Sequence, residues 1–184
     1  MKTPFISFLI PLLFMTYSFK ADPIKTIRFD KANSSLTYHM SHPMHEWDGI
    51  SKEVDGVVQI DAQNLLIQKV ALVCKVSSFD SKNSNRDSHL LEITEAIKYP
   101  SVSFVSTQVK DNGEEVEVQG KIIFHNVTKE ISFKAQSKTN AKNRVITGAF
   151  TLALEDFNLE RPSLMMVKTS NDLKMRFSVS FVTN

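Results

Sequence analysis

Histidine is the residue type in this sequence that is best spaced for chemistry. Three of the five histidines, His39, His42 and His45, follow one another at intervals of three residues. Imidazole is a common zinc ligand, and in a loop Glu46 or Asp48 could complete such a site. On a strand, residues three apart point to opposite faces, which separates His42 from the other two. Metal binding by these histidines is therefore the alternative, and a structural hydrogen bond from His42 is the interpretation that we favour.

The sequence contains no motif that is typical of nucleophilic catalysis. It lacks a Gly-x-Ser-x-Gly motif, and its one cysteine, Cys74, lies in an alternating apolar run, where a small buried side chain is expected. A single cysteine excludes an intramolecular disulfide and a metal site built from several cysteines. The five glycines are too widely spaced for a glycine-rich phosphate-binding loop. We therefore predict a binding protein that is not an enzyme and carries no cofactor.

The composition is that of an ordinary globular domain. Of 184 residues, 42% are hydrophobic and 23% are charged. The formal net charge of +2 is too small for binding through phosphate neutralisation, so we expect no nucleic-acid partner. Because no intramolecular disulfide is available, the stability of the domain must come from a hydrophobic core.

The N-terminal segment differs from the rest of the chain. Residues 4–19 carry no charge and are rich in Phe, Leu and Ile, with a lysine on either side. This run is shorter than the ~20 apolar residues of a membrane-spanning helix. We interpret residues 1–18 as a Sec-type signal peptide cleaved after Ser18, with an uncleaved anchor as the alternative. Residues 19–184 then form a single domain that is periplasmic or secreted.

Apolar and polar residues alternate from residue 34 onward, as is typical of strands with one buried face. Turn sequences such as Asp111-Asn112-Gly113 join many of these runs, so consecutive strands are expected to pair antiparallel. Closing such a sheet removes its unpaired edges, which favours an up-and-down antiparallel β-barrel of about eight strands over a sandwich. A short candidate ninth run lies around residues 26–30. The eight runs cover residues 35–40, 54–60, 70–76, 102–106, 115–124, 130–135, 146–154 and 173–181.

One segment follows a helical period instead. Three apolar residues recur at helical spacing within residues 84–98, and Asp87 or Ser88 is placed to cap the first turn. We predict one inserted helix of about three turns, lying across the barrel or over one end. The stretches 41–52 and 155–172 follow neither period and are expected to be irregular.

The inward faces of the predicted strands carry many bulky apolar side chains. A strand of about eight to ten residues, at ~3.3 Å each, gives a lumen of roughly 25–33 Å, which accommodates an extended lipid tail. Each buried methylene contributes ~0.8 kcal/mol to binding. A packed core without a ligand is the alternative. The predicted lining residues are Leu36, Tyr38, Leu72, Phe104, Val118, Ile122, Phe133, Phe150, Leu152, Phe177 and Phe181.

Two segments, Ser84–Leu91 and Lys98–Phe104, resemble the signature of the YceI-like family of lipid- or polyisoprenoid-binding proteins. The shared features are an Arg-Asp-x-His-Leu run followed by Tyr-Pro-x-x-x-Phe. In one further segment Asn126 replaces the usual turn glycine, and Asn tolerates the left-handed conformation. The additional similar segments are residues 34–38 with His42, 118–129 and 148–157, so that the resemblance spans about residues 28–182.

The resemblance implies a lipocalin-like, extended barrel that is exported to the bacterial periplasm. It implies binding of a polyisoprenoid, quinone-like or fatty-acid-like amphiphile in an apolar tunnel, often by a homodimer, with transient membrane contact as a further expectation. We expect Asp87 to cap the helix and Arg86 to pair with a carboxylate or a carbonyl. His42 and Arg86 are candidates for the head-group site. Met165 and Met166 either line the mouth, where methionine adapts to irregular ligands, or plug the core.

Overall fold

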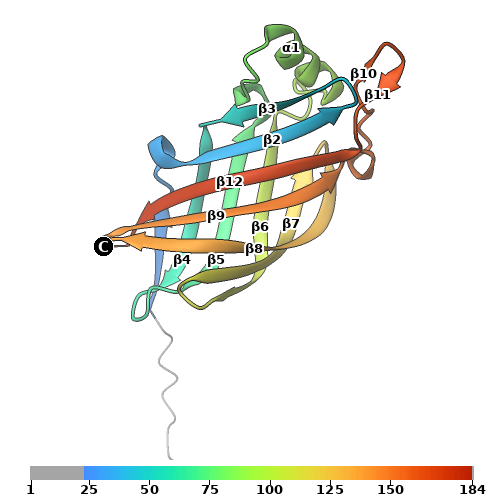
Figure 1. The fold of residues 1–184 in the computed structure, drawn as a ribbon. Helices are drawn as coiled ribbons and strands as arrows, with labels where there is room; N and C mark the ends of the chain where they lie inside the picture. Colours follow the sequence, from blue (N-terminus) through green and yellow to red (C-terminus); the bar gives the residue numbers. More distant parts are fainter. Residues whose placement is uncertain (1–22, 184) are drawn as a thin grey trace, which may run out of the picture.

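The computed structural model describes residues 23–183, so the signal peptide predicted for residues 1–18 lies outside the described chain. The described residues form an elongated, strongly curled antiparallel sheet with one α-helix over one end (Figure 1). Within them, no helix combines the length and the apolar character that crossing a membrane requires.

Ten strands make up the main sheet of the described residues, and two very short strands form a separate hairpin. The sheet order is β1-β4-β5-β6-β7-β8-β9-β12-β2-β3. The one α-helix is α1 (Ser84–Ile93), and three short 3-10 turns are η1 (Lys31–Asn33), η2 (Val76–Ser78) and η3 (Leu154–Phe157). The strands are β1 (Ile24–Arg28), β2 (Ser35–His42), β3 (His45–Ser51), β4 (Val54–Asp61), β5 (Ile67–Lys75), β6 (Ser101–Asp111), β7 (Glu115–Phe124), β8 (Val127–Asn140), β9 (Asn143–Ala153), β10 (Ser163–Leu164), β11 (Val167–Lys168) and β12 (Asp172–Val182).

The two edge strands of the described sheet, β1 and β3, do not pair with each other. The sheet instead closes through contacts between each edge strand and a neighbouring segment. Beside β3, the backbone of Ile50 exchanges two hydrogen bonds of 3.0 Å with Asp80. Beside β1, the Asp30 N–H donates to the Ser180 carbonyl at 2.7 Å. The predicted all-β, antiparallel, barrel-like class with one inserted helix is therefore confirmed. The sheet has ten strands: the eight predicted runs, β1 (Ile24–Arg28) at the candidate ninth run, and β3, which was not predicted.

The strands that were not predicted, β3 and the β10–β11 hairpin, lie in stretches where the alternation is weak. β3 (His45–Ser51) occupies a stretch expected to be irregular, and most of its side chains are exposed, so its pattern carries little apolar signal. The β10–β11 hairpin lies in the second such stretch and has four exposed strand residues. A strand at a sheet edge buries only part of one face, and its pairing is then set by the backbone and not by apolar periodicity.

Helix α1 lies over one end of the barrel, and its ten residues make about three turns, both as predicted (Figure 1). Its N-cap is Asn83, whose side chain accepts hydrogen bonds from the backbone N–H groups of the first turn, so the predicted cap at Asp87 or Ser88 is wrong. The Asp87 carboxylate instead accepts from the backbone N–H of Ser81 at 3.0 Å. The helix ends at Ile93, because two residues later Glu95 adopts a left-handed φ of 45°.

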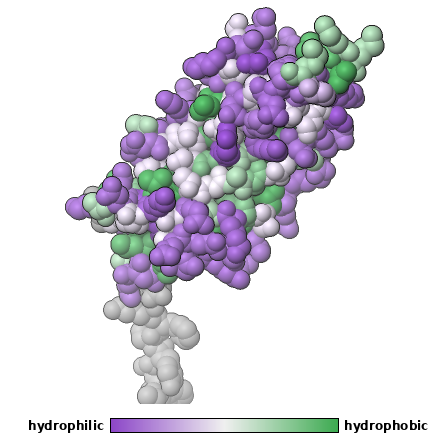
Figure 2. Space-filling model, viewed as in Figure 1, coloured by the Kyte–Doolittle hydropathy of each residue, from purple (hydrophilic) through white to green (hydrophobic). Residues whose placement is uncertain are grey.

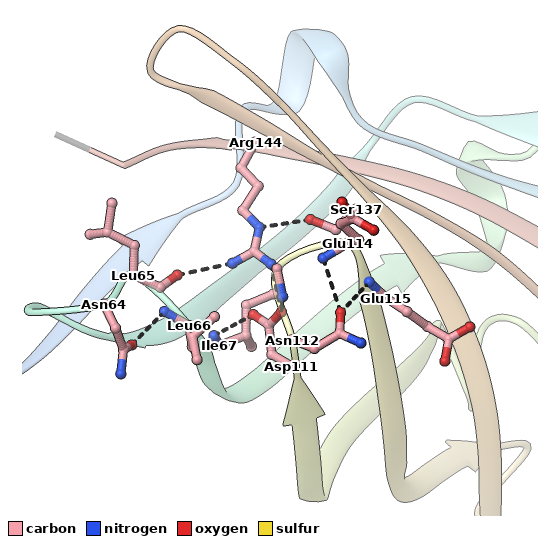
Figure 3. A network of polar contacts seen from close by, with 11 residues as sticks. Asn64, Leu65, Leu66, Ile67, Asp111, Asn112, Glu114, Glu115, Ser137 and Arg144 are labelled. Atoms are coloured by element: carbon pink, nitrogen blue, oxygen red, sulfur yellow. Dashed lines mark hydrogen bonds and ion pairs between the residues drawn. The ribbon is translucent and has the colours of Figure 1, made fainter.

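A buried ion pair closes the opposite end of the barrel (Figure 3). The Arg144 guanidinium donates to the Asp111 carboxylate at 2.7 Å, to the Ser137 hydroxyl at 2.9 Å and to the Leu65 carbonyl at 2.9 Å. The second oxygen of Asp111 accepts from the Ile67 N–H at 2.6 Å. These bonds tie together the β4–β5, β6–β7 and β8–β9 connections. We call this the ion-pair end, and the end beneath α1 the helix end.

A candidate ligand-binding tunnel

A cavity of about 300 Å³ runs through the interior of the barrel. Its wall extends from Leu90 of α1 at the helix end to Ile146 and Phe181 beside the ion pair. Apolar side chains make up most of the wall. All eleven residues predicted to line a tunnel lie on it: Leu36, Tyr38, Leu72, Phe104, Val118, Ile122, Phe133, Phe150, Leu152, Phe177 and Phe181.

Four phenylalanines form a contiguous cluster within this wall. The Phe133 ring lies 5.7 Å from Phe104, 5.3 Å from Phe150 and 5.4 Å from Phe177, measured between ring centroids. Three of the four are only partly buried, although they point into the barrel, because the cavity leaves part of each ring uncovered. The cluster therefore lines an open space and does not fill it.

Glycines in the wall make room for these rings. At Gly148, a Cβ atom would lie 2.6 Å from Cζ of Phe177, well inside van der Waals contact. The ring of Phe177 thus lies against the backbone of the neighbouring strand instead of projecting into the lumen. The same arrangement joins Gly49 to Tyr38, Gly56 to Phe29 and Gly120 to Phe104.

His42 is a structural residue at the helix end of the cavity. Only 3% of it is exposed, its Nε2 donates to the Val167 carbonyl at 3.0 Å, and its Nδ1 accepts from the Met44 N–H at 3.2 Å. These partners require the neutral ring with the proton on Nε2. The predicted structural hydrogen bond is confirmed, and it connects the β2–β3 turn to the β10–β11 hairpin.

The three closely spaced histidines do not converge. His39 lies on the outer face, where Nδ1 is 2.9 Å from the Asp48 carboxylate, whereas His42 points into the cavity. His45 stacks on Trp47, with ring centroids 5.0 Å apart. No group of three or more His, Cys, Asp and Glu side chains among residues 23–183 is arranged to hold a metal ion. The geometry gives the metal-binding alternative no support.

Arg86 lies on the cavity wall at the helix end. Its guanidinium donates to the Ser81 carbonyl at 2.9 Å and to the Ser81 hydroxyl at 3.2 Å, which confirms the predicted pairing with a carbonyl. It also lies 5.4 Å from the centre of the Trp47 ring, within cation–π range. The other polar residues of the wall are His42, His45, His89, Thr94, Ser103, Ser163 and Thr169, and none of the wall residues carries a carboxylate. One end of the cavity is therefore polar and basic, and the other is apolar.

Met165 and Met166 are not part of the cavity wall and do not plug the core, but they lie on the hairpin beside the mouth of the cavity. They form the turn of the β10–β11 hairpin and are 78% and 100% exposed. Leu164, just before them, does line the cavity. The turn projects the two side chains away from the wall, a consequence of a hairpin that the sequence pattern did not reveal.

Two buried side chains near the wall have raised pKa values. Burial raises the pKa of the Cys74 thiol, which is 1% exposed and lies 3.2 Å from the Ser51 hydroxyl. Burial likewise raises the pKa of the Tyr38 hydroxyl, and this effect outweighs its hydrogen bond to Trp47. Both groups are neutral at physiological pH. The prediction that Cys74 is a small buried side chain is confirmed.

Residues 28–181 match the YceI-like domain. The chain belongs to the YceI-like family. Among curated relatives, Protein YceI of Salmonella newport is 28% identical over 169 residues, covering 86% of this chain and 88% of that protein. A UPF0312 protein of Enterobacter sp. is 28% identical over 157 residues, covering 80% and 81%.

Three solved structures have a fold similar to that of this chain. BcnA of Burkholderia cenocepacia superposes with a TM-score of 0.74 at 16% identity, covering 83% of this chain and 98% of that one. A polyisoprenoid-binding domain from Saccharophagus degradans gives 0.67 at 16% identity, covering 85% and 97%. The YCEI protein of Campylobacter jejuni gives 0.62 at 22% identity, covering 72% and 82%. At these identities the likeness shows a shared fold.

Proposed function

We propose that this YceI-like protein binds a single amphiphile, with an isoprenoid or acyl tail in the cavity and its head group at the helix end. The observation that carries the proposal is the uneven wall of the cavity, which is apolar through the phenylalanine cluster and polar only beneath α1. The resemblance to a polyisoprenoid-binding domain supports an isoprenoid tail. The protein then acts as a carrier or store for that molecule in the periplasm or outside the cell.

The energetics favour a long tail over a short one. A buried carbon contributes ~0.8 kcal/mol, so a five-carbon isoprene unit contributes about 4 kcal/mol. Association costs about 4–15 kcal/mol in lost translational and rotational freedom. One unit therefore only offsets the lower end of that cost, while four units exceed its upper end. Tight binding therefore needs a tail of several isoprene units. Strands of eleven residues, such as β9 and β12, enclose a cavity that is long enough for such a tail.

The polar end suits a head group with hydrogen-bond acceptors. Arg86, His45 and His89 offer donors there, and Trp47 offers a flat aromatic surface. A quinone carbonyl, a carboxylate or a phosphate fits these donors. Within residues 23–183, no hydroxyl on the cavity wall is hydrogen-bonded to a histidine, and we therefore propose binding and not catalysis.

Solvent extraction of the purified protein, followed by mass spectrometry, tests this function. We expect one long-tailed amphiphile per protein, or stoichiometric uptake when geranylgeraniol or oleic acid is added to delipidated protein. Geraniol, with a tail half as long as that of geranylgeraniol, is the matched control and should bind far more weakly. Finding no copurified lipid and no uptake of either long-tailed compound would count decisively against the proposal.

A further inference from the structure

Five exposed apolar side chains lie together beside the helix end of the cavity. Met44, in the β2–β3 turn, is 65% exposed. The β10–β11 hairpin contributes Leu164, Met165, Met166 and Val167, which are 45%, 78%, 100% and 44% exposed. Figure 2 shows hydrophobic colours gathered over this hairpin, where it projects from a largely hydrophilic surface. We call these five residues the apolar rim.

The two residues of the hairpin turn are of types that rarely occur in its backbone conformation. Met165 and Met166 have φ values of 51° and 65°, so both adopt the left-handed conformation. Two consecutive left-handed residues between paired strands form a type I′ turn, which favours Asn-Gly and disfavours bulky side chains. The chain nevertheless carries two long apolar side chains at this position, and both point into solvent. Local folding gives no reason for them, whereas a binding role does.

The apolar rim is continuous with the cavity. At the base of the hairpin, Ser163, Leu164 and Thr169 line the cavity wall. The hydrogen bond from His42 to the Val167 carbonyl fixes the hairpin to the β2–β3 turn, which carries Met44. A surface that covers the rim therefore also covers the cavity mouth.

The size and charge of the rim favour a lipid bilayer as its occupant. A stable protein interface takes about 20–30 residues from each partner, far more than the five of the rim. A few apolar side chains are enough to enter a membrane interface, especially beside basic residues that attract anionic lipids. The hairpin, residues 163–168, carries Lys168 and no acidic residue, whereas Arg161 at its base is paired with Glu155 at 3.6 Å. Lys168 lies next to Val167 and is exposed.

We propose that the apolar rim docks on a lipid bilayer and places the cavity mouth against its hydrocarbon layer. The bound amphiphile then passes between bilayer and cavity without its tail crossing water. This inference rests on the proposed function, because it assigns to the rim the step that loads and unloads the tail.

The variant M165N/M166G tests the inference without endangering the fold. Asn-Gly is the preferred sequence of this turn, so the variant should be at least as stable as the native protein. Vesicles of phosphatidylethanolamine and phosphatidylglycerol are used in a flotation assay with the delipidated protein. A methionine fully buried in the membrane interface strengthens partitioning by about tenfold, so even partial burial of both predicts a loss of about tenfold for the double variant. The control, V105T, changes a residue that is 52% exposed in β6, away from the rim, and should partition like the native protein.

Three outcomes separate the alternatives. If the native protein does not float with vesicles, or M165N/M166G floats equally well, the docking inference is overturned. If sedimentation velocity shows a dimer that M165N/M166G converts to a monomer, the rim binds a second copy of the chain and the inference is again overturned. Uptake of geranylgeraniol from detergent is measured in parallel for both proteins. Equal uptake with unequal flotation supports the inference, whereas no uptake by either protein refutes the proposed function itself.

Discussion

The substitution Gly148→Ala narrows the cavity by adding one methyl group to its wall. The new Cβ would lie 2.6 Å from Cζ and 2.8 Å from Cε1 of Phe177. Both are side-chain atoms, and the third neighbour is the Ala135 Cβ at 3.2 Å, so the backbone is not forced to move. To restore ordinary contact at 3.4 Å, the Phe177 ring must recede by at least 0.8 Å, and the open side of that ring is the cavity.

The expected losses of binding and folding free energy are similar in size, but only the binding loss depends on the length of the tail. Overpacking of this kind costs about 1–3 kcal/mol of folding free energy. A ring that excludes two to three methylenes of the tail removes about 2 kcal/mol of binding free energy, which weakens the affinity about thirtyfold. The loss should grow with tail length, because a short tail that ends before Phe177 does not meet the displaced ring.

Competition against a fluorescent fatty acid measures these affinities over a series of tail lengths. Two further variants show whether the loss arises at Phe177. Adding Phe177→Leu to Gly148→Ala removes the ring atoms that the methyl group meets, and should recover most of the affinity. Gly113 lies in a turn with a φ of 96° and has no atom within 4 Å of an added Cβ, so Gly113→Ala destabilises the fold while affinity stays unchanged. Equal affinities of Gly148→Ala and the native protein at every tail length would refute the argument.

Three further predictions concern the buried groups and the surface. Arg144→Ala leaves Asp111 buried without its partner and should lower the free energy of unfolding by about 3–5 kcal/mol in urea titrations, a result contradicted by a loss below about 1 kcal/mol. Lys134 is the exposed comparison, because its ion pairs with Glu115 and Glu117 lie in solvent. Lys134→Ala should lose only a small fraction of the stability that Arg144→Ala loses, and an equal loss would show that burial does not set the difference. Because burial raises the pKa of the Cys74 thiol, alkylation by iodoacetamide at pH 8 should be much slower in the folded protein than in guanidinium, and equal rates would contradict that burial.

The inward face of the barrel was predictable because alternation encodes it directly. Phe150 and Leu152, for example, follow one another at every second position of β9, so their side chains had to share a face. In β2, Leu36, Tyr38 and His42 all lie at every second position, so their side chains share the inward face and His42 lies inside the barrel. Local periodicity thus sufficed for most of the cavity wall.

Features that depend on long-range pairing were not predictable. Arg144 has the parity of an inward residue, but its partner, Asp111, lies at the end of a strand 33 positions away, and no local pattern joins the two. Trp47 reaches the wall because β3 pairs with β2 at Met40, a register set by the backbone. The hairpin turn at Met165 and Met166 was missed because its residue types are the opposite of those that normally signal such a turn.

Anomalous diffraction from a bound amphiphile that carries bromine at the end of its tail locates the tail and shows whether the cavity holds it. We expect a bromine peak near Ile146 and Phe181 at the ion-pair end, with the head group beside Trp47 and Arg86. The tail would then pass the phenylalanine cluster. A bromine peak outside the barrel, or a saturated crystal with no bromine in the cavity, would contradict it.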